Sequence, residues 1–128
     1  MARQYAQIVG IVLLLLGIVG LVLGDPTPLL GALNIDLPED IIHLLTGAIL
    51  AYVGFATVDG ATVKTVVGAI GVLFLLAGIA GFISPRAFGL LTHDWTIVDN
   101  IIHLLLGILG IAAGFLLDRT TTVNVNRA

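Results

Sequence analysis

The sequence EDIIHLLTG at residues 39–47 recurs as DNIIHLLLG at residues 99–107, so that each matched pair lies sixty positions apart. In both copies an acidic residue precedes a histidine by four positions, and a glycine follows the histidine by four. Residues three or four apart share one face of an α-helix. Each copy therefore predicts a helix with acid, histidine and glycine on a common face.

The composition is that of a membrane protein. The chain has 128 residues, of which 59% are hydrophobic and only 10% are charged, and its mean hydropathy is +1.17. Soluble domains average about 25% charged residues. The sixteen glycines also fit membrane helices. The lack of cysteine excludes disulfides and thiolate metal sites, and the net charge of −3 indicates no nucleic-acid partner.

Four apolar runs are candidate membrane spans, and with their flanking turns each reaches the roughly 20 residues that a span requires. The first run also has features of a signal peptide. Its glycines nevertheless recur in the third run at an offset of 61, which indicates an internal repeat instead. The runs cover residues 8–23, 41–58, 66–83 and 101–117, and the glycine pairs are Gly10 with Gly71, Gly17 with Gly78 and Gly20 with Gly81.

We therefore predict a single domain over residues 1–128, an all-α integral membrane protein with four transmembrane helices. The helices form two parallel helical-hairpin repeats, at 5–58 and 62–117, followed by a polar tail at 118–128. Because both hairpins share one orientation, a pseudo-twofold axis along the membrane normal is expected. Short interfacial helices are expected in the two outer connections, and Trp95 in an aromatic belt. The predicted interfacial helices cover residues 26–33 and 85–91.

The basic residues predict the orientation. Arg3, Lys64, Arg119 and Arg127 lie on one side of the predicted spans, and Arg86 lies alone on the other. Basic residues are commoner in cytoplasmic segments. We expect a multi-pass protein of the cell membrane with both termini in the cytoplasm.

The glycines predict where the helices pack. In lipid, small residues allow helices to approach closely, and pairs spaced four apart are typical of such contacts. The two histidines fall on the same faces as these glycines. The pairs are Gly20 with Gly24, Gly47 with Ala51, Ala77 with Gly81, and Gly110 with Gly114, and the two faces are His43, Gly47, Leu50, Gly54 and His103, Gly107, Gly110, Gly114.

The acids at the two helix starts have a structural interpretation. Asp36 with Glu39 and Thr96 with Asp99 both have the spacing of a capping box. Acids in a first helical turn also interact favourably with the helix dipole. On this interpretation the histidines make only structural hydrogen bonds, and the protein holds no cofactor.

The alternative interpretation is a ligand site in the outer leaflet. A twofold relation could bring His43 and His103 face to face, where two imidazoles could ligate a haem iron or a pigment. They could also bind a metal such as zinc, with Glu39 and Asp99 as further ligands. Two histidines alone leave both interpretations open.

The repeated motif resembles that of a known family. The pattern [Asp/Glu]-[Asp/Asn]-x-x-His-x-x-x-Gly, opening a membrane helix of a small four-helix protein, is similar to the bacterial domain-of-unknown-function 4383 family. Asp99, Asn100, His103 and Gly107 carry the resemblance best, and Asp40 stands in place of the asparagine in the first copy. The resemblance covers nearly the whole chain and implies fold and location, but no activity.

These observations favour a structural or accessory membrane protein. It would contact the lipid bilayer and pack with partner membrane protein subunits or with its own copies as a homo-oligomer. An enzyme is not expected, because no catalytic motif is present. A transporter is also less expected, because no charged residue lies in the middle of the apolar runs.

Overall fold

The computed structural model describes residues 1–24, 32–56, 58–91 and 94–117, and within these ranges the regular structure is helical. The four long helices are α1 (Ala2–Leu23), α2 (Leu37–Phe55), α3 (Gly60–Ile83) and α4 (Ile97–Ile111). α4 continues as the π-helix η2 (Ala112–Leu116), so that the last helical segment spans Ile97–Leu116. All four segments are long and apolar enough to cross a membrane.

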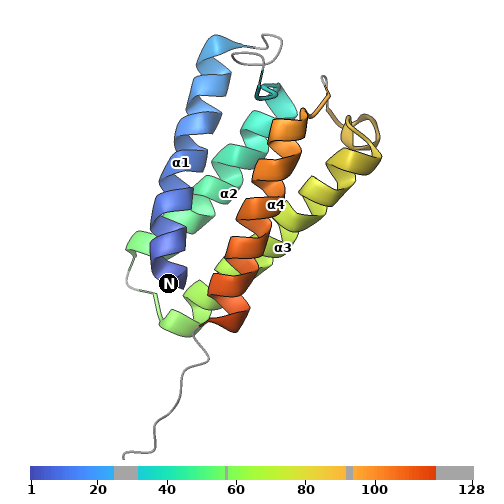
Figure 1. Ribbon diagram of the computed structural model, residues 1–128. Coiled ribbons are helices and arrows are strands. Elements are labelled where there is room, and N and C mark those ends of the chain that lie inside the picture. Colours follow the sequence, from blue (N-terminus) through green and yellow to red (C-terminus); the bar gives the residue numbers. More distant parts are fainter. Residues whose placement is uncertain (25–31, 57, 92–93, 118–128) are drawn as a thin grey trace, which may run out of the picture.

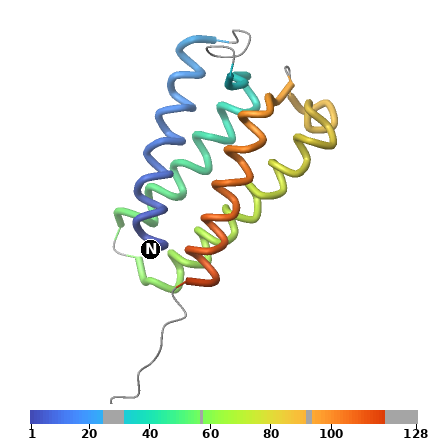
Figure 2. The backbone as a smooth tube through the Cα atoms, viewed as in Figure 1, coloured from blue at the N-terminus to red at the C-terminus, as the bar shows by residue number. Residues whose placement is uncertain are grey.

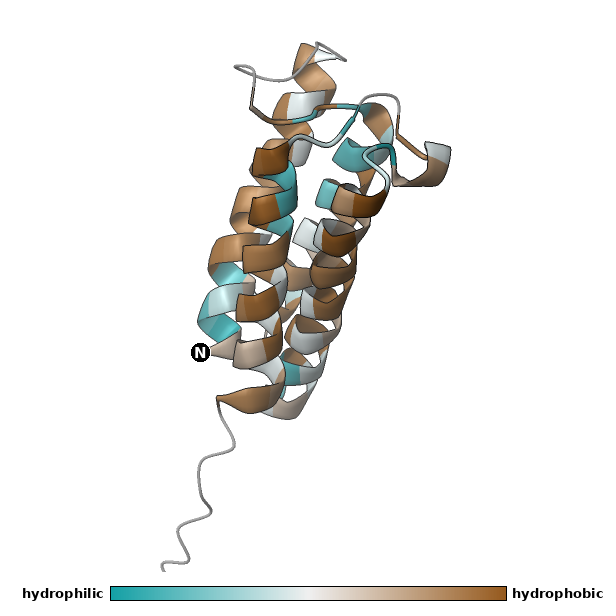
Figure 3. Ribbon diagram, turned by 45° about the vertical axis from the view of Figure 1, so that its right-hand side comes forward, coloured by the Kyte–Doolittle hydropathy of each residue, from teal (hydrophilic) through white to brown (hydrophobic). Residues whose placement is uncertain are grey.

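Each helix packs chiefly against its neighbour in the sequence. α1 pairs with α2 and α3 pairs with α4, and the two hairpins then contact each other mainly through α3 (Figures 1 and 2). The connections after α1 and after α3, which the sequence predicts to be outside, leave from one end of the bundle, named here the outer end; the N-terminus lies at the opposite end, named the inner end (Figure 1). The hydropathy colouring shows apolar residues along most of the four helices, with hydrophilic residues mainly near the ends of the bundle (Figure 3).

Glycines form the contacts within each hairpin. A Cβ at Gly10 would lie 2.5 Å from the backbone nitrogen of Ala51 on α2, and one at Gly71 would lie 2.6 Å from the nitrogen of Ile111 on α4. Likewise, a Cβ at Gly17 would meet Leu44 and one at Gly78 would meet Leu104. These backbones approach too closely to admit any larger residue. The predicted pair Gly20 with Gly24 is wrong in part, because Gly24 ends α1 with φ +80° and a Cβ there would meet no atom of the described residues within 4 Å.

A few polar contacts hold the inner end of the bundle together. Arg3 donates hydrogen bonds to the carbonyls of Val53, Ala56 and Val58, which lie at and beyond the end of α2. Hydrogen bonds to the last carbonyls stabilise a helix end that has no further backbone partner. The Tyr5 hydroxyl donates to the carbonyl of Leu106 at 2.7 Å and so links the two hairpins.

Asp59 caps the start of α3. It accepts hydrogen bonds from the hydroxyl and the backbone N–H of Thr62, which hold the pKa of Asp59 below its ordinary value.

The outer connections differ from the prediction. Of the helix expected at 26–33, residues 26–31 lie outside the described residues. In place of the helix expected at 85–91 there is a single 3-10 turn, η1 (Ala87–Gly89). Ala87 and Phe88 have positive φ angles of 47° and 59°, which interrupt any longer helix. The polar tail at 118–128 also lies outside the described residues.

Candidate metal site at the outer end of the bundle

The capping box predicted for the second repeat is present. Thr96 is the N-cap of α4, and its hydroxyl accepts the Asp99 N–H at 3.1 Å. The Asp99 carboxylate in turn accepts the Thr96 N–H at 2.8 Å. Two backbone donors at the helix start are thereby satisfied. The Asp99 side chain is therefore part of the cap of α4.

The first repeat forms only half of its capping box. Asp36 caps α2 by accepting the Glu39 N–H at 3.0 Å. The Glu39 side chain does not return to Asp36. Its Oε1 accepts from the indole Nε1 of Trp95 at 3.0 Å, and its Oε2 accepts from Nδ2 of Asn34 at 2.8 Å. Glu39 is thus aimed from α2 toward the second hairpin.

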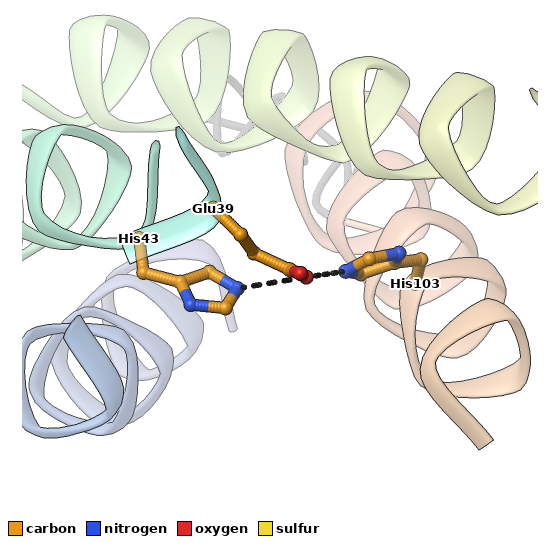
Figure 4. A group of neighbouring side chains, drawn as sticks. All are labelled: Glu39, His43 and His103. Atoms are coloured by element: carbon orange, nitrogen blue, oxygen red, sulfur yellow. Dashed lines mark ion pairs between the residues drawn. The ribbon is translucent and has the colours of Figure 1, made fainter. Parts of the chain in front are cut away.

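Both histidines converge on this carboxylate. The Nε2 atoms of His43 on α2 and His103 on α4 lie 3.7 Å and 3.6 Å from Glu39 Oε1, and the carboxylate stands between the two rings (Figure 4). Both separations exceed the length of an ordinary N–H···O hydrogen bond. One ligand atom from each of the three residues lies within 4.8 Å of the other two. We call Glu39, His43 and His103 the histidine–glutamate cluster.

Asp99 does not join the cluster. It was predicted as a further metal ligand, but its Oδ2 accepts hydrogen bonds from Thr96 and from the backbone N–H of Asn34 at 2.9 Å. Asp99 stays out of the cluster because Asn34, in the connection between α1 and α2, donates a further hydrogen bond to it. The structure therefore brings together three of the four predicted ligand residues.

Buried acidic side chains gather around the cluster. Among the described residues, four carboxylates at this end of the bundle are at most 4% exposed. The two connections at 24–36 and 84–96 contain a single lysine or arginine, Arg86, which is exposed and pairs with Asp94 at 2.7 Å. Buried carboxylates require a compensating charge or proton. A bound cation would supply that charge. The four buried acids are Asp36, Glu39, Asp40 and Asp99.

His103 has an unsatisfied nitrogen. The side chain is 6% exposed, and its Nδ1 has no hydrogen-bond partner among the described residues. Its ring contacts Phe74 and, edge to face, Trp95, with ring centroids 5.8 Å and 5.2 Å away. His103 is therefore held mainly by aromatic packing.

The sequence analysis missed two residues of this site. Trp95 was expected in a lipid-facing belt, but its indole N–H turns inward to Glu39. Asn34 was not singled out, although it is 4% exposed and bonds the acids of both repeats. Its place two residues before the N-cap Asp36 was the only local signal.

Two cavities flank the cluster, one on each side. They share Glu39, His43, Phe74 and His103 in their walls. The cavity bordered by α1 and α4 has a volume of about 70 Å³, and the one bordered by α2 and α3 has about 260 Å³. The cluster therefore contributes to the walls of both cavities.

Comparison with known proteins gives one family. Residues 1–56 match the family described as Domain of unknown function (DUF4383). The match covers α1 and α2, including Glu39 and His43, and confirms the resemblance over this part of the chain. No curated protein and no solved structure matches the chain.

Proposed function

We propose that this chain is a multi-pass membrane protein that binds a divalent transition-metal ion through Glu39, His43 and His103. The convergence of these three side chains carries the proposal, because they come from both hairpins and meet within 4.8 Å. Four apolar helices are compatible with a multi-pass location. The positions of Arg3 and Lys64 opposite Arg86 support cytoplasmic termini.

The spacing of the cluster suits an ion. Zinc binds imidazole nitrogen and carboxylate oxygen at roughly 2.0–2.2 Å, so two ligands of a tetrahedral ion lie roughly 3.4 Å apart. The two nitrogen–oxygen separations of 3.6 Å and 3.7 Å are close to this value, and one nitrogen of each ring lies within 4.8 Å of the other. Two imidazoles with one carboxylate are a ligand set that both zinc and non-haem iron use.

Neighbouring residues orient the carboxylate. Trp95 and Asn34 each donate to one Glu39 oxygen, as hydrogen-bonded partners of metal ligands commonly do. Glu39 cannot rotate away without breaking both bonds. The neighbours therefore pre-organise the acid for a ligand.

The size of the cavities favours an ion over haem or a pigment. Pockets for organic ligands typically enclose roughly 300–1,000 Å³. The two cavities here have volumes of about 70 Å³ and 260 Å³, and the cluster itself lies between them. A flat macrocycle ligated by both histidines would have to displace Glu39 from its position between the rings.

We further propose that the two hairpins are copies of one unit related by a pseudo-twofold axis. The glycine contacts support this, since Gly10 with Ala51 and Gly71 with Ile111 are matched pairs at offsets of 61 and 60. The relation would explain why a histidine from each hairpin reaches the same point.

A structural or accessory role remains a prediction. The broadly apolar exterior supports contact with lipid or with other membrane subunits. The glycines within the helices are buried, apart from Gly60 at the start of α3. Association with partners or with its own copies would therefore rely on larger side chains, without the close approach that glycine permits.

Metal content is the test of the proposed function. The protein is purified in mild detergent, stripped with chelator, incubated with zinc and desalted. We expect about one zinc per chain in the wild type and a loss of stoichiometric zinc in His43→Gln and in His103→Gln. His93→Gln is the matched control, because it removes the one histidine that is not part of the repeated motif.

Two results would contradict the proposal. One is equal zinc in the wild type and in both cluster variants. The other is a wild type without zinc, iron or another transition metal both as purified and after reconstitution. A thermal unfolding profile of each variant shows whether a lost ion reflects a lost ligand or a lost fold.

A further inference from the structure

The chain joins the two hairpins at the inner end of the bundle. Each outer connection links the two helices of one hairpin, whereas the short link between α2 and α3 runs at the inner end, near the N-terminus (Figure 1). The hydrogen bond from Tyr5 to the Leu106 carbonyl also joins the hairpins, and Leu106 lies deeper in the bundle than His103. The outer ends of the hairpins therefore have no covalent link to each other.

Close backbone packing is confined to each hairpin. Where an added Cβ on a helix glycine would come within 3.0 Å of another helix's backbone, that helix belongs to the same hairpin. A Cβ at Gly47 on α2 would lie 2.8 Å from the backbone nitrogen of Leu14 on α1, and one at Gly107 on α4 would lie 2.4 Å from that of Leu75 on α3. These two glycines lie one turn deeper than the cluster histidines. Each hairpin is thus a rigid unit at the level of the cluster.

The space between the hairpins is less well filled at this level. α2 and α4 carry the three ligand side chains, yet these two helices hardly pack against each other. The two cavities of about 70 Å³ and 260 Å³ have walls from both hairpins. Atoms that line a cavity lose the attractive contacts that close packing provides. Packing alone therefore holds the hairpins together weakly beside the cluster.

Three hydrogen bonds cross between the hairpins at the outer end, and each involves a residue of an outer connection. They run from the Asn34 N–H to Asp99, from the Trp95 indole to Glu39 and from the Thr96 hydroxyl to the Ala32 carbonyl. Between the facing side chains of α2 and α4, the cross-hairpin contact is that of Glu39 Oε1 with His103 Nε2. Their separation of 3.6 Å exceeds an ordinary hydrogen bond, so it does not fix the distance between the helices (Figure 4).

The two hairpins contribute unequally to the cluster. The first supplies Glu39 and His43, which lie one turn apart on α2, and hydrogen bonds orient the Glu39 carboxylate. The second supplies His103 alone. Its Nδ1 has no partner among the described residues, and its ring is held by contacts with Phe74 and Trp95. His103 is therefore the ligand whose position depends most on how the hairpins pack.

We propose that the bound ion is a clamp that closes the outer end of the bundle. An ion on Glu39 and His43 takes His103 as its third protein ligand, and this bond sets the separation of α2 and α4. The ion binds the closed arrangement more tightly than an open one, which offers two ligands, and it therefore shifts the population toward closure. This inference rests on the metal binding proposed above. It adds a regulatory consequence, because metal binding becomes a change of shape within the membrane.

Spin labels measure this separation directly, and the chain has no cysteine of its own to interfere. Ile41→Cys with Ile101→Cys places labels at matched positions of α2 and α4, which are 46% and 47% exposed. Double electron–electron resonance is recorded on the full chain in nanodiscs, first with chelator and then with zinc. We expect zinc to shorten the mean distance between the labels and to narrow its distribution.

A second pair of labels is the control for changes within a hairpin. Ile18→Cys with Ile41→Cys marks α1 and α2 near the outer end, at positions that are 50% and 46% exposed. Zinc should leave this distance unchanged, because the glycine contacts hold the two helices together. The matched pair Leu45→Cys with Leu105→Cys lies one turn deeper than the first pair and should show the same closure. It serves if the first pair does not fold.

A ligand variant shows which side chain closes the clamp. In the protein labelled at 41 and 101, His103→Gln should abolish the response to zinc, whereas His93→Gln should retain it. Glu39→Gln, which removes the charged ligand, serves if His103→Gln does not fold. An equal response to zinc in His103→Gln and His93→Gln would overturn the clamp.

Zinc content, measured on the same samples, separates the two proposals. Stoichiometric zinc with an unchanged distance between labels at 41 and 101 would overturn the clamp alone. A change of the same size between labels at 18 and 41 would also overturn it, since the ion would then act within one hairpin. Absence of bound metal in both the wild type and the labelled protein would overturn the metal site and the clamp with it.

Discussion

Glu39 Oε1 on α2 lies 3.6 Å from Nε2 of His103 on α4, so an acid of the first hairpin pairs with a histidine of the second. The same oxygen lies 3.7 Å from His43 on its own helix. The equivalent acid of the second hairpin, Asp99, is bound in its helix cap. The site is therefore asymmetric, although the sequence around it is repeated.

This asymmetry makes the two acids separable by mutation. We expect Glu39→Gln to weaken zinc binding about tenfold or more, because it removes a charged ligand. Asp99→Asn should leave zinc affinity nearly unchanged but destabilise the start of α4 by about 1 kcal/mol, because it weakens the charge-assisted hydrogen bonds that Asp99 accepts from Thr96 and Asn34. Competition with a zinc-sensitive dye measures the affinity, and thermal unfolding measures the stability. Equal losses of affinity in both variants would show that Asp99 is a ligand after all.

Trp95 should act on the ion only through Glu39. Trp95→Phe keeps the ring but removes the N–H that donates to Glu39 Oε1 at 3.0 Å. Loss of a hydrogen bond to a metal ligand typically costs 10–100-fold in affinity, and we expect a loss of about that size. The same dye competition measures it, with the lipid-exposed Phe55→Leu as control. An unchanged affinity would mean that the indole has no part in orienting the acid.

Glycine contacts should dominate the stability of the hairpins. A Cβ at Gly110 would lie 2.8 Å from Cα of Gly71 and 2.9 Å from the Tyr5 hydroxyl. Gly110→Leu should therefore separate α3 from α4 and lower the thermal unfolding midpoint in detergent. Leu109→Ala, at a position that is 56% exposed, should change the midpoint little. Similar midpoints for the two variants would refute the close contact between these helices.

Labelling of single cysteines tests the orientation. Phe88 is 79% exposed at the outer end, and Ala61 is exposed at the start of α3 at the other end. A membrane-impermeant maleimide added to intact cells should label Phe88→Cys and spare Ala61→Cys until the cells are lysed. The reverse pattern would place the termini outside.

The local features of the site could be predicted from the sequence. The cap at Thr96 and Asp99 was evident from spacing alone, because a capping box involves residues within one turn. Burial of Gly47 and Gly107 followed from helical periodicity. The sixty-residue repeat also suggested that His43 and His103 could meet. These features depend on neighbours in the sequence or on the repeat itself.

The remaining features depend on partners distant in the sequence. Glu39 has the same capping-box spacing as Asp99, yet its side chain turns to Trp95, 56 residues away. Glutamate is one methylene longer than aspartate and can reach that indole. Asn34 bonds acids of both repeats, and its place two residues before the N-cap Asp36 does not predict the bond to the second repeat. For Glu39, tertiary contacts thus replaced the capping box that the spacing predicts.

The coordination of bound zinc tests the central claim most directly. X-ray absorption at the zinc edge of the reconstituted protein reports the atoms around the ion. We expect two imidazole nitrogens and one or two oxygens at roughly 2.0–2.2 Å, with the outer-shell scattering of the imidazole rings. That scattering should be halved in His43→Gln and in His103→Gln if a residual ion remains. A zinc shell of oxygens alone, without imidazole scattering, would contradict the account.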